Sequence, residues 1–181
     1  MAKENINSKK GFTIIEVVLV LAIAGLIFLM VFVALPALQR SQRDTARRND
    51  LARVDTSLVQ YQTNNQGTNN GSNLPDESTT WTGTETFENS NCRTSACKFV
   101  RNYMNSGTNA TTNTFQDPDG TYYSMNIGKG AYEYTGSQMD HVIYIRTGAR
   151  CDGEKAVADT ARHFAVIYRL EGAGTYCIDD Q

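Results

Sequence analysis

The chain has 181 residues, of which 40% are hydrophobic and 9% aromatic. This composition can bury a core, so disorder throughout the chain is excluded, and the length fits one ordinary domain or a small domain with an appendage. Lys and Arg number 17 and Asp and Glu 19, which gives a net charge of −2 and excludes nucleic-acid binding by overall basicity. A local DNA-binding patch is possible but unsupported.

The first predicted element is an apolar helix over residues 12–38. Residues 17–35 contain no charged and no strongly polar side chain, and as a helix they would span about 28 Å, close to the hydrocarbon thickness of a bilayer. The preceding residues, 1–11, carry three lysines and one glutamate, which favours a single-pass orientation with the N-terminus inside the cell. A cleaved secretory signal fits less well because the apolar run is too long.

One ionisable side chain, Glu16, lies near the start of the apolar segment. A charged residue inside a bilayer costs roughly 2.5–3.5 kcal/mol on insertion scales, and such residues usually have a function. The alternative is that Glu16 reaches the cytoplasmic edge of the membrane and is simply solvated there. We therefore take Glu16 as a candidate functional residue.

Residues 9–16, KKGFTIIE, and the apolar helix that follows resemble the class III signal of the type IV pilin and pseudopilin superfamily. The resemblance implies that a prepilin peptidase removes the leader, residues 1–11, by cutting after Gly11. It also implies that Phe12 becomes the methylated N-terminus and that Glu16, at the fifth mature position, acts in filament assembly. The resemblance covers only about the first third of the chain.

The expected function follows from this resemblance. A structural subunit of a type IV pilus-like filament would serve adhesion, motility or DNA uptake, and would pass from the cytoplasmic membrane to the cell surface. Its partners would be other pilin subunits, prepilin peptidase, the inner-membrane assembly machinery and, before assembly, membrane lipid. The alternatives are a pseudopilin of a type II-like secretion system and a membrane-anchored exported binding domain.

No enzymatic activity and no cofactor are predicted. The sequence contains no P-loop, dinucleotide fingerprint or HExxH motif, and no Ser-His-Asp order typical of a catalytic triad.

An amphipathic continuation of the helix is predicted over residues 39–62. Its apolar residues recur at spacings of three and four, which predicts one stripe that packs against a folded head. Its arginines are expected on a solvated face that meets neighbouring subunits, with lipid or nucleic-acid binding as the alternative. Gly25 and Pro36, within the apolar part, are predicted to kink or open the helix, because proline lacks a backbone donor.

The exported head is predicted over residues 63–181. Residues 63–91 are rich in Asn, Thr, Ser, Gln and Gly and are expected to form loops. A short helix is predicted over residues 95–106. Runs of β-branched and aromatic residues predict strands at 121–127, 140–147, 163–170 and 174–178, the last at a sheet edge. Without long helical spacers the sheet is predicted to be antiparallel, so the fold class is α+β: a long N-terminal α-helix packed on a small antiparallel β-sheet, the pilin fold.

Four cysteines in an exported segment suggest two disulfides, although four cysteines allow three pairings. We predict Cys92–Cys97 and Cys151–Cys177. Zinc is not expected, because Cys92 and Cys97 have no second cysteine pair with suitable spacing.

The sequence Asp117-Pro118-Asp119-Gly120 is the best candidate for a metal site. Asp117 and Asp119 offer the oxygen ligands that Ca²⁺ prefers, whereas Pro and Gly at these positions are typical of a type I turn. The turn is the favoured interpretation, and no metal is predicted. His141 and His163 begin two predicted strands; if these strands pair antiparallel, the histidines lie at opposite ends and cannot share a metal.

Overall fold

The computed structural model describes residues 11–65, 74–75, 79–81, 95–104, 115–135, 141–172 and 174–180. Contacts divide the chain into two compact units, residues 1–39 and residues 40–181. The leader before Gly11, most of the predicted loop region 63–91 and the predicted Cys92–Cys97 pair lie outside the described residues.

A single helix, α1 (Ile14–Asn64), contains both predicted helical segments. It includes a stretch long and apolar enough to cross a bilayer. The helix continues through Gly25 and Pro36 without interruption, so the predicted local opening is absent at these residues. A kink at either residue stays a prediction.

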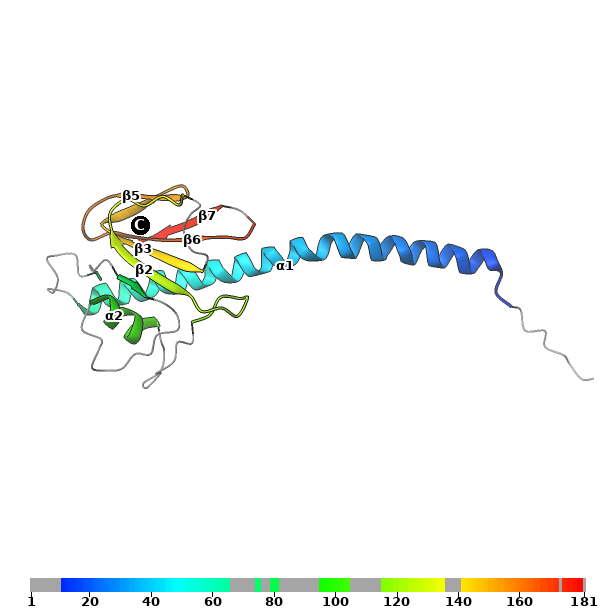
Figure 1. Ribbon diagram of the computed structural model, residues 1–181, viewed down its shortest axis with the longest axis horizontal. Helices are drawn as coiled ribbons and strands as arrows, with labels where there is room; N and C mark the ends of the chain where they lie inside the picture. Colours follow the sequence, from blue (N-terminus) through cyan, green and yellow to red (C-terminus); the bar gives the residue numbers. More distant parts are fainter. Residues whose placement is uncertain are drawn as a thin grey trace, which may run out of the picture. The chain divides into compact units, whose positions relative to one another are not determined.

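The second unit is built around a five-stranded sheet in the order β1-β2-β3-β6-β7 (Figure 1). Its strands are β1 (Thr79–Trp81), β2 (Ser124–Lys129), β3 (Val142–Thr147), β6 (Phe164–Arg169) and β7 (Thr175–Asp179). The last four confirm the predicted strands, and β7 lies at an edge as expected. The α+β class is confirmed, while β1 corrects the prediction of loops throughout 63–91.

One strand pair differs from the prediction of a purely antiparallel sheet. β2 and β3 are parallel, with Ser124 opposite Val142 and Lys129 opposite Thr147, while the other pairs of this sheet are antiparallel. A parallel pair needs a connection of about a dozen residues, and this connection need not be a helix. Residues 130–141 are long enough, so the missing helical spacer did not exclude a parallel pair.

The core lies between one face of the sheet and the second half of α1. The predicted apolar stripe faces this core: Leu51, Val54 and Leu58 are fully buried. The predicted short helix is present as α2 (Ser95–Phe99) and a π-helical turn (Val100–Met104), which pack into the same core. The other elements contribute these buried side chains to the core that α1 packs against: Phe99, Val100, Met104, Met125, Ile127, Ile143, Ile145, Phe164 and Val166.

A hairpin that was not predicted covers the other face of the sheet. It consists of β4 (Ala149–Asp152) and β5 (Lys155–Ala158), and its alanines pack with side chains of β3 and β6. Gly153 has a φ of 64° in the hairpin turn, a conformation that favours glycine. The predicted disulfide Cys151–Cys177 is confirmed and joins β4 to β7, with Cα atoms 5.9 Å apart.

Breaking this disulfide should destabilise the head. We expect Cys151→Ala, in the full chain in detergent micelles, to lower the free energy of unfolding by about 3 kcal/mol, because the bond closes a loop with a sequence separation of 26 residues. Urea unfolding under non-reducing conditions measures the difference. A non-reducing peptide map that links Cys177 to Cys92 would contradict the assignment.

Candidate functional site

The N-terminal segment places its candidate residues directly before and inside the first turn of α1. Gly11 and Phe12 precede the helix, and the Phe12 side chain is 89% exposed. Among the described residues, the bond between them lies outside every helix and strand.

Thr13 and Glu16 begin α1 with a reciprocal pair of hydrogen bonds. The Thr13 backbone N–H and hydroxyl donate to Glu16 Oε2 over 2.9 and 2.8 Å, and the Glu16 N–H points back to Thr13 Oγ1 at 3.4 Å. This is a capping box, which satisfies backbone donors that the first turn leaves without partners. The hydrogen bonds also hold the Glu16 carboxylate toward the N-terminal end of the helix.

Beyond this cap, α1 presents a continuous apolar surface. Large hydrophobic side chains from Phe12 to Leu38 are exposed, and Glu16 is the one ionisable residue between positions 11 and 39. Exposed apolar surface of this extent requires lipid or other apolar helices to cover it.

Residues 6–32 match the family model described as the prokaryotic N-terminal methylation motif. The N-terminal segment thus matches the type IV pilin signal. The match includes Gly11, Phe12 and Glu16, and supports a pilin- or pseudopilin-like subunit that is processed at its N-terminus and anchored in the membrane before assembly. No curated protein and no solved structure is significantly similar to the chain.

In the second unit, residues 40–181, a buried ion pair joins α1 to the 117–120 turn. The Arg47 guanidinium donates to both carboxylate oxygens of Asp117, each over 2.7 Å, and their side chains are 3% and 0% exposed. The Tyr168 hydroxyl adds a third hydrogen bond to Asp117, over 2.8 Å. Burial alone would raise the pKa of Asp117, but the bonds from Arg47 and Tyr168 hold it below its usual value.

The same turn of α1 also binds the β6–β7 connection. Asp44 accepts the backbone N–H groups of Glu171 and Gly172, each over 2.9 Å. Glu171 in turn accepts hydrogen bonds from Arg43 and lies 2.9 Å from Arg47 Nη1. These bonds lower the pKa of Glu171, with Arg43 as the main cause.

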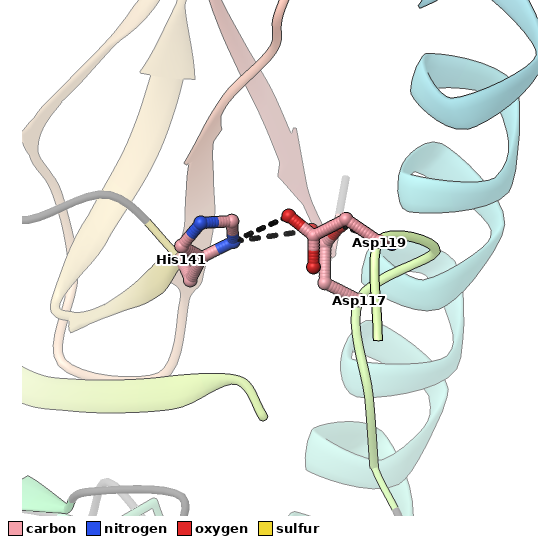
Figure 2. A group of neighbouring side chains, drawn as sticks. All are labelled: Asp117, Asp119 and His141. Atoms are coloured by element: carbon pink, nitrogen blue, oxygen red, sulfur yellow. Dashed lines mark hydrogen bonds and ion pairs between the residues drawn. The ribbon is translucent and has the colours of Figure 1, made fainter. Parts of the chain in front are cut away.

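The predicted turn at residues 117–120 is confirmed. The Gly120 N–H donates to the Asp117 carbonyl over 2.8 Å, and Gly120 has a φ of 91° that suits glycine. Figure 2 shows the His141 ring directed at the carboxylates of Asp117 and Asp119. The distance from His141 Nδ1 to Asp119 Oδ2 is 3.5 Å, and the Thr121 hydroxyl lies 3.1 Å from the same nitrogen.

Asp117, Asp119 and His141 bring potential ligand atoms within 4.8 Å of one another, but Asp117 and one oxygen of Asp119 already accept hydrogen bonds from protein groups. Asp117 binds Arg47 and Tyr168, and Oδ1 of Asp119 accepts from the backbone and hydroxyl of Thr121. The Arg47 guanidinium supplies the positive charge that a cation would bring. This geometry favours the turn over a calcium site, as the sequence did.

The two histidines lie as the sequence analysis expected. β3 and β6 are antiparallel, so His141 and His163 are at opposite ends of the pair. His163 is bound instead by Asp159 over 3.0 Å.

Sequence reasoning missed the role of Arg47 and the contact of His141 with the aspartates. The arginines of residues 39–62 were predicted as a group to lie on a solvated face, whereas the Arg47 side chain is buried. One signal was available: Asp44 and Arg47 lie one turn apart and next to the apolar stripe, where a buried charge needs partners from elsewhere in the chain.

Removing the Arg47 side chain should destabilise the head strongly. We expect Arg47→Met to lower the free energy of unfolding by about 3–5 kcal/mol near neutral pH, because Asp117 would be left buried and unpaired. The contribution of Asp117 is present above about pH 4 and lost below it, because its folded pKa is lowered, so the difference should shrink in acid.

Denaturant unfolding of the full chain in micelles at several pH values measures this. The exposed Arg40→Met is the matched control and should change little. An Arg47→Met chain as stable as wild type at neutral pH would contradict the assignment.

Proposed function

We propose that this chain is a structural subunit of a type IV pilus-like filament, cut after Gly11 by a prepilin peptidase and assembled through the apolar part of α1. The observation that carries the proposal is the exposed apolar surface with Glu16 at its start, directly behind the matched processing motif. The role is structural rather than catalytic, and the partners are other subunits, the peptidase and the inner-membrane assembly machinery.

The capping box gives Glu16 a place in this proposal. Cleavage after Gly11 would create a positively charged amine on Phe12, four residues before Glu16. Thr13 already holds the Glu16 carboxylate toward that end of the helix. In a filament whose apolar helices exclude water, the carboxylate would pair with the amine of its own or a neighbouring subunit and offset the desolvation of both.

Processing tests the proposal first. Mass spectrometry of the chain expressed in a cell with prepilin peptidase should find an N-terminal peptide that begins at methylated Phe12. A chain that keeps residues 1–11 would favour a membrane-anchored exported domain. Loss of surface filaments on deletion would identify a pilus subunit, and loss of protein secretion would identify a secretion pseudopilin.

Assembly should depend on Glu16. We expect Glu16→Ala to leave cleavage and the thermal stability of the head unchanged, and to reduce filaments at least about tenfold, because an unpaired buried amine costs about 3–5 kcal/mol. Electron microscopy of sheared filaments, with immunoblots of membrane fractions, measures this.

The exposed head residue Glu133 provides the control, and Glu133→Ala should assemble normally. Normal filaments with Glu16→Ala in a major subunit, or uncleaved Glu16→Ala chain, would contradict the pairing of Glu16 with the amine.

A further inference from the structure

Asp55 occupies an unusual position on α1. Its side chain is partly buried, and its Oδ1 atom has neither solvent contact nor a hydrogen-bond partner among the described residues. A buried carboxylate oxygen without a partner is costly when charged, so Asp55 is not explained by packing alone.

The charges from outside α1 that act on Asp55 are also acidic. Asp179, in the last position of β7, and Asp180, which follows it, act electrostatically on Asp55. Both are fixed in place by backbone donors: Asp179 accepts from the Cys151 N–H over 2.6 Å, and Asp180 accepts from the Phe164 N–H over 3.2 Å. Neither carboxylate can turn away without losing its hydrogen bond.

Among the described residues, no cation contributes to the electrostatics of Asp55. Arg48, two turns earlier on α1, lies instead over the Tyr176 ring of β7, 5.2 Å from its centre. On α1, the positions one turn before and after Asp55 are Leu51, Ala52, Leu58 and Val59, which are uncharged. His163, before β6, interacts with Asp179 and Asp180 but is held by Asp159. Arg150 of β4 also lies near Asp159, at 3.8 Å.

We propose that Asp55, Asp179 and Asp180 form an acid-responsive contact between α1 and β7, which becomes stronger when Asp55 takes up a proton. Protonation removes the buried charge and its repulsion from two fixed carboxylates. The contact between helix and last strand is then tightest in mildly acidic surroundings and weaker at neutral pH.

The direction follows from the electrostatics. Burial, followed by the charges of Asp180 and Asp179, raises the pKa of Asp55 to about 6. The folded chain therefore binds a proton that the unfolded chain has already lost between about pH 4 and pH 6, and stability falls as the pH rises through this interval.

Three other groups also titrate and must be separated from Asp55. The pKa of His163 is raised by its bond to Asp159, so its contribution is also lost as the pH rises. The pKa values of Asp117 and Glu171 are lowered, so their contributions are lost only in stronger acid. The pH dependence of wild type alone therefore cannot test the proposal, and the difference between variants is needed.

Asp55→Asn, which has the shape of the protonated residue without its charge, tests the contact. In the full chain in detergent micelles, we expect this variant to raise the Tm by about 3–6 °C near pH 7.5 and by about half as much near pH 5, because wild type loses the contribution progressively between about pH 4 and pH 6. Asp180→Asn keeps an acceptor for the Phe164 N–H and should give a smaller rise. The double variant should gain less than the sum, because the two charges interact.

The exposed Asp152→Asn carries the same change of charge and should shift the Tm equally little at both pH values. A lower Tm for Asp55→Asn near pH 7.5, or an equal rise at both pH values, would overturn the proposal. So would a Ca²⁺- or Mg²⁺-dependent rise in the Tm of wild type that Asp55→Asn abolishes, since the carboxylates would then hold a cation instead of a proton.

Discussion

The Arg47–Asp117 ion pair is the contact on which the arrangement of the head depends. Arg47 is buried on α1, and its guanidinium is bound by a carboxylate 70 residues later in the chain. Neither charge can be desolvated without the other, so the 117–120 turn must sit against this helical turn and nowhere else. Asp44 and Arg43 extend the same constraint to the β6–β7 connection. These polar contacts fix the sheet to the helix at one position. Leu51, Val54 and Leu58 bury apolar surface, which stabilises the packing but does not select that position.

Much of the fold could be predicted because its signals are local. An unbroken apolar run, a stripe of spacing three and four, and short β-branched segments predict α1 and four strands directly. The parallel β2–β3 pair could not be predicted. Its direction depends on whether the connection, residues 130–141, returns to the end of the sheet where β2 began, and no local residue pattern indicates this. The β4–β5 hairpin was missed although Asp152-Gly153 is a recognised turn signal.

The N-terminal site was predictable for the same reason, since Gly11, Phe12, Thr13 and Glu16 lie within six consecutive positions. The polar contacts of the head were not. Asp55 faces residues 124 or more positions away, and Arg47 appears in the sequence as one arginine among several. A buried charge can be recognised from sequence only when its partner is close along the chain, and here tertiary pairing decides the environment.

The placement of Cys177 in β7 affects the order in which an exported chain can fold. In the proposed N-inside orientation, residues cross the membrane in sequence order, so α1, β2 and β3 emerge before β7. The hydrogen bonds from Glu171 and Gly172 to Asp44 form only after β6 has emerged, and the β6–β7 pairing and the Cys151–Cys177 bond form only after β7 has emerged. Until then Cys151 is an unpaired thiol in an oxidising compartment, where it can attack an existing disulfide and form a mixed disulfide. A thiol-disulfide oxidoreductase could therefore complete the Cys151–Cys177 bond only after β7, the last strand, has emerged and brought Cys177 to Cys151.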